Sequence, residues 1–328
     1  MARSTSSHVP SPVAVPGTSI PPGAPSSRTS VAAPGRSVAL NLIISLRPAQ
    51  WTKNLLVFAG LLFGRKLLDP GAVADAVLAF AVFCALSGVV YLVNDISDRE
   101  TDRNHPLKAQ RPIASGALPV PIAAVGAGVL GLAALTVSTA LGWLFTAVAV
   151  AYVALQTLYS GPLKHIVIID VLTLAIGFVL RAVAGAVAVH VEISHWLLVC
   201  TVLLALFMAL AKRRHEIVLL AGDARTHRPI LGEYSPYLLD QMIAVVTAST
   251  LIAYIFYTVS PETQAKFETP WLGLTIPFPL YGIFRYLYLV HRREGGGSPS
   301  ELLLTDRPLL ACVALWAIAV AVIIYRPL

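Results

Sequence analysis

The stretch VADAVLAFAVFCALSGVVYLVNDISDRETD, residues 73–102, decides how the rest of this chain is interpreted. Its first part, Val73 to Val93, is almost wholly apolar and has the length that a helix needs to cross a membrane, about 20 residues. Its second part carries the carboxylates of Asp95, Asp98 and Asp102 directly after this span. Carboxylates are costly at the edge of a bilayer, so a group of them at this place indicates a function.

Helix geometry would gather these polar side chains if the span stays helical through them. At about 100° per residue, Asn94, Asp98 and Asp102 fall within about 80° on one face. Asp95 lies at about 100°, at the edge of the same face. Neighbouring carboxylates repel one another unless a cation lies between them, and Mg²⁺ shared with a phosphorylated substrate fits oxygen ligands of this kind. The alternative is that pairs such as Asp95 and Arg99 merely solvate the helix end.

The composition places the whole chain in a membrane. Of its 328 residues, 56% are hydrophobic and 12% are charged, and the mean hydropathy is +0.74. Soluble domains carry about 25% charged residues. The apolar runs are about 20 residues long and lack the alternation of barrel strands, so the protein is expected to be helical. The three cysteines all lie in apolar runs and imply no disulfide framework.

The chain divides into a tail and one membrane domain. Residues 1–36 are rich in Ser, Pro, Ala and Gly, which predicts a disordered cytosolic tail, and they contain no signal-peptide core. Residues 37–328 are expected to form a single all-α, polytopic domain of about nine transmembrane helices around a central cavity. The expected spans are 40–64, 73–96, 119–140, 143–160, 166–190, 195–220, 238–259, 270–290 and 308–325.

Basic residues concentrate in the loops after the even-numbered spans, although Arg65 and Lys66 break this pattern. The positive-inside rule therefore places the N-terminus and these loops in the cytosol and the C-terminus outside. The carboxylates after span two lie at the same face. A cavity that opens there would receive a water-soluble phosphorylated substrate from the cytosol and a lipid from the bilayer. The loop residues that carry this prediction are Arg99, Arg103, Lys108, Arg111, Lys164, His165, Lys212, Arg213, Arg214, Arg225, Arg228, Arg292 and Arg293.

Span five contains two charged residues, Asp170 and Arg181, on one helix face. Gly177 and Gly185 lie close to that face, so another helix or a ligand could approach the backbone there. An arginine several turns into a membrane is a candidate anion ligand. The alternative is a structural ion pair between Arg181 and a carboxylate on another helix.

Further basic residues are candidate phosphate ligands. Lys53 lies far enough into span one to meet a lipid phosphate. Lys164 either contacts substrate or only sets the topology. Lys212 and its neighbours end span six, where they could hold phosphate, although Lys212 and Glu216 could instead pair at the surface. The sequence contains no zinc-ligand spacing, Walker sequence, dinucleotide fingerprint or serine elbow, and nucleic-acid binding is not indicated.

The motif Asn94-Asp95-x-x-Asp98-x-x-x-Asp102, at the end of the second span, resembles the first aspartate motif of the UbiA superfamily of intramembrane prenyltransferases. The sequences at 47–54 (RPAQWTKN), 159–165 (YSGPLKH) and 181–185 (RAVAG), with Lys212-Arg213, extend this resemblance to the decaprenyl-phosphate phosphoribosyltransferase branch. It covers residues 40–325. The second aspartate motif of many superfamily members is reduced here to Asp170, which weakens a scheme with two metal motifs.

The resemblance implies transfer of phosphoribose from 5-phosphoribosyl 1-diphosphate to a polyprenyl phosphate, with release of pyrophosphate, for cell-wall arabinan precursors. It implies a bacterial cytoplasmic membrane protein, and a homo-oligomer is compatible with it. Asp98 and Asp95 would be catalytic, and Asn94, Asp98 and Asp102 would bind Mg²⁺. The substrate-binding residues would be Lys53, Lys108, Arg111, Tyr159, Lys164, Asp170, Arg181, Lys212 and Arg213.

Two other functions stay open from the sequence. The first is transfer of a polyprenyl group from its diphosphate to an aromatic acceptor, which uses the same Mg²⁺ and diphosphate chemistry. The number of cationic groups argues against it, because an aromatic acceptor needs fewer. The second is a transporter that couples ions through Asp95, Asp98 and Arg181. Its binding groups would be expected at the midplane, whereas these polar residues cluster at one membrane face.

Overall fold

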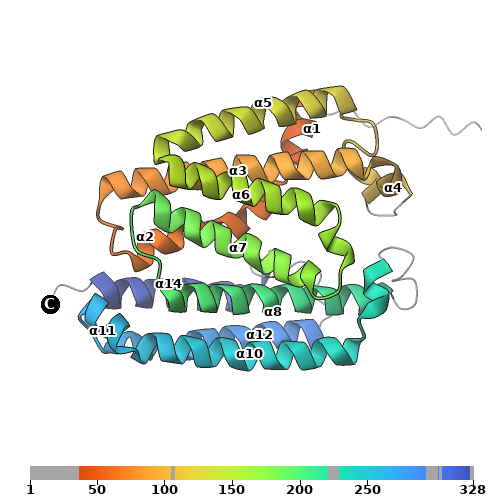
Figure 1. Cartoon of the computed structure of the whole chain (residues 1–328). Coiled ribbons are helices and arrows are strands. Elements are labelled where there is room, and N and C mark those ends of the chain that lie inside the picture. Colours follow the sequence, from red (N-terminus) through yellow and green to blue (C-terminus); the bar gives the residue numbers. More distant parts are fainter. Residues whose placement is uncertain (1–36, 105–107, 221–228, 293–301, 303–304, 326–328) are drawn as a thin grey trace, which may run out of the picture. The chain divides into compact units, whose positions relative to one another are not determined.

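The computed structural model describes residues 37–104, 108–220, 229–292, 302 and 305–325, and these residues form helices and no strand (Figure 1). The expected tail, residues 1–36, lies outside them. The helices are α1 Val38–Ser45, η1 Pro48–Phe58, α2 Ala59–Phe63, α3 Pro70–Ser97, α4 Arg99–Arg103, η2 Lys108–Gln110, α5 Val120–Ser138, η3 Thr139–Leu141, α6 Trp143–Ser160, η4 Leu163–His165, α7 Ile169–Ala188, α8 His195–Leu220, η5 Pro229–Glu233, α10 Pro236–Val259, α11 Pro261–Phe267, η6 Trp271–Thr275, α12 Pro277–Arg292 and α14 Arg307–Tyr325.

Seven helices in the described part of the chain are long and apolar enough to cross a membrane. They correspond to seven of the expected spans, but the count of nine is not confirmed. Residues 40–64 form α1, the 3-10 helix η1 and the short α2, because Arg47 adopts a left-handed conformation and Pro48 follows it. Residues 270–290 form η6 and α12, which has 16 residues and begins at Pro277.

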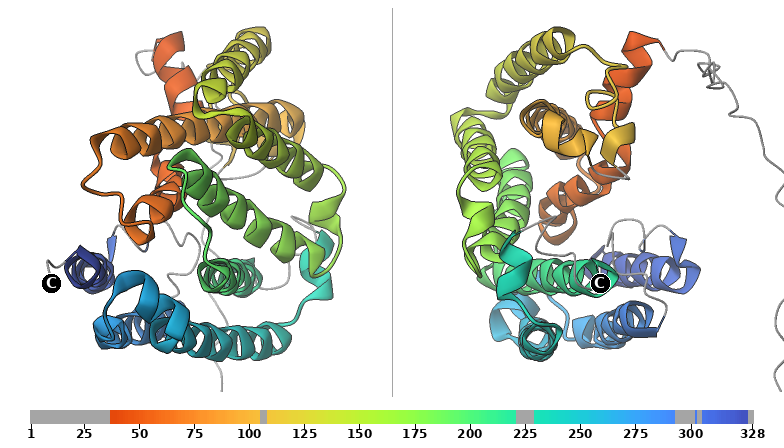
Figure 2. Two further views of the ribbon diagram at one scale, coloured as in Figure 1. Left: turned by 60° about the vertical axis from the view of Figure 1, so that its left-hand side comes forward. Right: turned by 90° about the vertical axis from the view of Figure 1, so that its right-hand side faces the viewer.

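Two of these helices, α3 and α7, are the most buried, whereas α5 and α6 expose most of their apolar side chains. α3 packs against η1, α5, α6 and α7. Phe83 of α3 meets Phe145 and Tyr152 of α6 in the core between them. Figure 2 shows the α1–η1–α2 segment beside α3 and α7 from two further directions. The exposed side chains of α5 and α6 suit contact with lipid.

Glycines let η1 and α2 lie directly against α7. A Cβ atom on Gly185 would lie 1.8 Å from the carbonyl oxygen of Val57. A Cβ atom on Gly60 would lie 2.7 Å from the backbone of Ala186. The prediction that another segment approaches the glycine face of span five is therefore confirmed at Gly185. This contact holds η1, which contains Lys53 and Asn54 a few residues before Val57, against α7.

The ends of α3, α6 and α8 meet at one end of the helices, on the right in Figure 1. Lys164 of η4 lies 4.0 Å from Asp98 at the end of α3. The hydroxyl of Tyr234, which follows η5, accepts a hydrogen bond from the backbone N–H of Ile168 before α7. The helix ends that carry the predicted site residues are thus joined by side-chain contacts.

Candidate active site

The carboxylates at the end of α3 occupy two faces and not one. α3 ends at Ser97, and Asp98 caps it before α4 begins at Arg99. Backbone hydrogen bonds of 2.8 Å still run from Asp98 to Asn94 and from Asp102 to Asp98. The side chains nevertheless separate, because Asp95 and Asp102 turn towards Arg111 whereas Asp98 faces Lys164. The single ligand face expected from ideal helix geometry is therefore divided.

Asp95 and Asp102 form the inner face, where arginines neutralise both carboxylates. The Nη1 atom of Arg111 lies 3.1 Å from Asp95 and 2.6 Å from Asp102, and both aspartates are 3% exposed. Arg47 also pairs with Asp95, and Lys108 lies 3.9 Å from Asp102. Arg111 and Lys108, expected to bind substrate, here hold the segment after α4 against α3.

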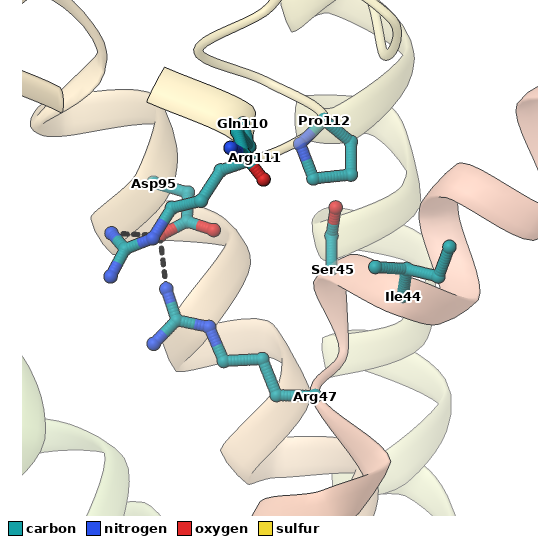
Figure 3. Close-up of a pocket in the computed structure, with 7 residues that line it drawn as sticks. All are labelled: Ile44, Ser45, Arg47, Asp95, Gln110, Arg111 and Pro112. Carbon is teal, nitrogen blue, oxygen red and sulfur yellow. Dashed lines mark hydrogen bonds and ion pairs between the residues drawn. The ribbon is translucent and has the colours of Figure 1, made fainter. Parts of the chain in front are cut away.

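A cavity of about 290 Å³ lies beside this face. Figure 3 shows the guanidinium groups of Arg47 and Arg111 converging on Asp95 at its wall. Because the carboxylate is already paired with both arginines, this wall offers little free negative charge for a metal ion. The cavity is lined by Ile44, Ser45, Arg47, Asp95, Gln110, Arg111 and Pro112.

Asn94 and Asp98 form the outer face. The Asp98 side chain is 48% exposed, and its nearest cation is the Lys164 amine at 4.0 Å. Among the residues that the structure describes, no group of three or more His, Cys, Asp or Glu side chains could hold a metal. Because Asp98 is half exposed and loosely paired, the oxygen atoms of its carboxylate and of the Asn94 amide are free to bind a cation. A divalent cation bound there would take its further ligands from phosphate and water.

Arg181 lies deep in the protein, is 5% exposed, and is bound by neutral groups. Its Nε donates to the Asn54 side chain at 2.7 Å, Nη2 donates to the Tyr152 hydroxyl at 2.8 Å, and Nη1 donates to the Gly177 carbonyl at 2.8 Å. Its guanidinium also lies 4.8 Å from the Tyr152 ring centre. In the described ranges, no carboxylate lies within ion-pair distance of Arg181. The described part of the structure therefore does not contain the structural ion pair that was the alternative for this arginine.

Lys53 adds a second charge near Arg181. It lies within electrostatic range of Arg181, Lys212 and Arg47. No ion pair involves Lys53 in the described part of the chain, whereas Lys212 lies 3.8 Å from Glu216, as the surface-pair alternative expected. Positive charge that has no carboxylate partner attracts an anion, and phosphate is the anion that such a group of cations binds in proteins.

Asp170 and Arg213 form a sealed ion pair between α7 and α8. Arg213 donates from Nε to Asp170 at 2.9 Å, and these side chains are 2% and 0% exposed. Arg213 also reaches Glu216 at 2.8 Å and the Tyr159 hydroxyl at 3.1 Å. Asp170, Arg213 and Tyr159, expected to bind substrate, are thus bound to one another.

Tyr234 completes this group by donating its hydroxyl to the other oxygen of Asp170 at 2.8 Å. Burial raises the pKa of Tyr234 to about 12. The hydroxyl therefore keeps its proton at neutral pH and can donate it to the Asp170 carboxylate.

Sequence reasoning missed the neutral partners of the buried charges. Asn54 follows Lys53 at the end of the sequence RPAQWTKN, residues 47–54. Its place in this motif is the one sequence feature that could have marked it as a site residue. No local sequence pattern singles out Tyr152 or Tyr234, because each lies far along the chain from the charged residue that it binds. Tyr152 binds Arg181, and Tyr234 binds Asp170. Of the predicted residues, the structure brings Asp98 and Lys164 together, and it engages Asp95, Asp102 and Asp170 in ion pairs with arginine.

The family model, the related sequences and the solved structures that match this chain all point to the same family. Residues 54–305 match the model of the UbiA prenyltransferase family. The decaprenyl-phosphate phosphoribosyltransferase of Corynebacterium glutamicum is 34% identical over 303 residues, which cover 89% of each chain. The enzyme of the same name from Mycolicibacterium smegmatis is 33% identical and covers 90% of this chain and 95% of its own. A UbiA homologue from Archaeoglobus fulgidus, solved with GPP and Mg²⁺, has a TM-score of 0.67 at 20% identity and covers 88% of this chain and 99% of its own.

Proposed function

This chain belongs to the UbiA prenyltransferase family, and from that premise we propose that it transfers phosphoribose from 5-phosphoribosyl 1-diphosphate to a polyprenyl phosphate. In this reaction the bond between the anomeric carbon and the pyrophosphate oxygen breaks. A bond from the same carbon to an oxygen of the lipid phosphate forms, and pyrophosphate leaves. The names of the two bacterial relatives support transfer of a phosphoribosyl group to a polyprenyl phosphate, because both align over nearly the whole chain. The product would serve cell-wall arabinan synthesis.

The observation that carries the proposal is a set of cations that the described carboxylates do not neutralise. Lys164 lies beside the carboxylate of Asp98, whereas Lys53 and Arg181, on η1 and α7, have no ion-pair partner among the described residues. A donor with two phosphorylated positions and an acceptor with a lipid phosphate together bring more negative charge than a prenyl diphosphate and an aromatic ring. The charge of the site therefore favours phosphoribosyl transfer over aromatic prenylation.

Asn94 and Asp98 fit a Mg²⁺ ion that the diphosphate would share. Both present oxygen ligands, Asp98 is accessible, and neither is held by arginine in the structure. The Mg²⁺ in the Archaeoglobus fulgidus homologue supports the same choice of ion. When bound, Mg²⁺ would stabilise the charge that develops on the leaving pyrophosphate.

The chain's own residues would act by binding and electrostatics. Lys164 would contact the diphosphate beside Asp98, and Lys53 with Lys212 would bind a second phosphate. Arg181 would add its positive charge from the protein interior. The lipid phosphate is already an anionic nucleophile, so no side chain needs to remove a proton from it. Catalysis would come from holding the two reactants in line and from stabilising the leaving group.

The carboxylates that are paired with arginine would have a structural role. Asp95 and Asp102, with Arg111 and Lys108, would hold α4 and the following segment in place. Asp170 and Arg213, with Tyr159, would join α7 to α8. In this proposal Asp98 is the catalytic carboxylate, and Asp95 supports it from the opposite face of α3.

The protein is a multi-pass membrane protein, since it has seven apolar helices of spanning length among its described residues and belongs to this family. We further propose that residues 37–328 act as a single domain in the bacterial cytoplasmic membrane. The N-terminus and the site would face the cytosol, where the soluble donor is made.

The test is a transfer assay with purified protein in detergent. Radiolabelled 5-phosphoribosyl 1-diphosphate, Mg²⁺ and a polyprenyl phosphate are incubated together, and label is measured in the organic phase. We expect label there only when the protein, the lipid and Mg²⁺ are all present. Absence of transfer, beside an active relative as a positive control, would contradict the proposal. A polyprenyl diphosphate with an aromatic acceptor would then be the next pair to test.

A further inference from the structure

The turn between η4 and α7 contains a strained residue. Ile168 has φ of +69° and ψ of −43°. These angles lie near those of the γ-turn with positive φ, about +75° and −65°, which is rare and strained. A branched Cβ atom makes the conformation more costly still, and only glycine adopts positive φ readily. A residue of this kind keeps such a conformation only where its surroundings hold it.

Tyr234 supplies the contacts that hold this turn. Its hydroxyl accepts a hydrogen bond from the Ile168 N–H at 2.7 Å and donates one to Asp170 at 2.8 Å. One hydroxyl thus binds both the strained residue and the second residue of α7. Tyr234 is 5% exposed, and Asp170 is fixed in turn by Arg213. Water cannot readily replace a hydroxyl in such a buried place.

The turn sets the position of Lys164. Only Ile166 and Val167 separate Ile168 from η4, which contains Lys164. The backbone N–H of Asp170 donates to the carbonyl of Ile166 at 3.0 Å, so the residue that follows η4 is hydrogen-bonded to the start of α7. A rotation of the chain at Ile168 would therefore move the Lys164 amine away from Asp98, which it approaches to 4.0 Å.

We propose that Tyr234 is a positioning residue that keeps the Ile168 turn in its strained form and so holds the Lys164 amine beside Asp98. This inference rests on the proposed function for the role of Lys164, but the mechanical part does not depend on it. Among the described residues, Tyr234 itself forms no hydrogen bond with Lys164 or Asp98. Its effect would be transmitted through the backbone of residues 164–170.

The first variant is Tyr234→Phe, which removes only the hydroxyl. We expect kcat for phosphoribosyl transfer to fall about tenfold, the loss expected when one charge-bearing contact in the transition state is misplaced. The KM for the polyprenyl phosphate should stay unchanged, because Lys164 is assigned to the diphosphate. Tyr237→Phe is the matched control, since Tyr237 is 75% exposed near the start of α10, and this variant should keep full activity.

A rescue variant separates positioning from general destabilisation. Glycine adopts positive φ without strain, so Ile168→Gly combined with Tyr234→Phe should restore most of the lost kcat and most of the lost melting temperature. In a Lys164→Gln background, Tyr234→Phe should lower kcat by less than about twofold, because both changes act through the same contact. If Tyr234→Phe alone does not fold, the double variant with Ile168→Gly should fold.

Three results would overturn the inference. They are full activity in folded Tyr234→Phe, additive losses with Lys164→Gln, and failure of Ile168→Gly to restore either kcat or the melting temperature. If the wild-type protein transfers no phosphoribose, the proposed function fails, and the melting-temperature rescue still decides whether Tyr234 holds the turn.

Discussion

Two buried arginines of the same helix bundle, Arg181 and Arg213, have opposite electrostatic surroundings. Arg213 is enclosed with the carboxylates of Asp170 and Glu216, so its charge is neutralised inside the protein. In the described part of the chain, Arg181 is bound only by neutral oxygens from Asn54, Tyr152 and a backbone carbonyl. We therefore propose a structural role for Arg213 and an anion-binding role for Arg181.

This difference predicts opposite effects of the same substitution. Arg213→Met should destabilise the protein by about 3–5 kcal/mol, because it leaves Asp170 buried without its cation. Arg181→Met should cost less stability, because no opposite charge is left behind, yet it should lower kcat/KM at least about tenfold. Thermal unfolding in detergent and the transfer assay measure the two effects. A greater loss of melting temperature in Arg181→Met than in Arg213→Met would refute the assignment.

Arg111 is predicted to stabilise the end of α3 and not to bind substrate directly. Arg111→Met would leave Asp95 with Arg47 but Asp102 with Lys108 at 3.9 Å, so we expect a loss of about 3 kcal/mol in unfolding free energy. Arg111→Lys should recover part of it, since a single ammonium can replace one of the two contacts. Glu100→Gln is the control, because the Glu100 side chain is 75% exposed and its pairs should contribute little. An unchanged melting temperature in Arg111→Met would count against the structural role.

At the scale of elements, residues 40–64, which the sequence predicts to be the first span, determine where Lys53 lies. These residues are broken into α1, η1 and α2, and η1 carries Lys53 and Asn54. The contact between the Val57 carbonyl and Gly185 brings η1 against α7. Without that contact, Asn54 could not reach Arg181.

Gly185→Ala should therefore disturb both the packing and the site. The added methyl group would lie 1.8 Å from the Val57 carbonyl oxygen, so η1 must move away from α7. We expect lower stability, by about 1–3 kcal/mol, and a loss of transfer activity. The matched control is Gly128→Ala in α5, where a Cβ atom meets nothing within 4 Å, and this change should be neutral or stabilising. Equal behaviour of the two variants would contradict the close approach.

The long apolar helices could be predicted from the sequence because hydropathy is a property of adjacent residues. The site could be predicted only in part, because its contacts join distant positions. Asp95 and Arg47 are 48 positions apart, and Arg181 and Asn54 are 127 positions apart. The motif at the end of α3 predicts a polar site, but local periodicity could not reveal that arginine binds Asp95 and Asp102 and leaves Asp98 exposed.

At the scale of the whole molecule, the charges at the ends of α3, α6 and α8 predict one orientation in the membrane. Single cysteines placed at Ser115 and at Glu192, in a background without the native cysteines, should react differently with an impermeant maleimide. Both positions are exposed at connections between helices. We expect labelling of Glu192→Cys in intact cells and of Ser115→Cys only after permeabilisation. The reverse pattern would place the site outside the cytosol.

Asp98 is the carboxylate on which the assignment of the active site depends. The decisive measurement is Mg²⁺-dependent phosphoribosyl transfer by Asp98→Ala protein whose thermal unfolding is recorded in parallel. We expect the rate to fall by at least about a hundredfold, because leaving-group stabilisation is lost. The melting temperature should change by no more than about 2 °C, because this side chain is half exposed and its ion-pair partner in the described part of the chain, Lys164, lies 4.0 Å away. Normal transfer by the folded variant would contradict the metal and diphosphate site at Asn94 and Asp98.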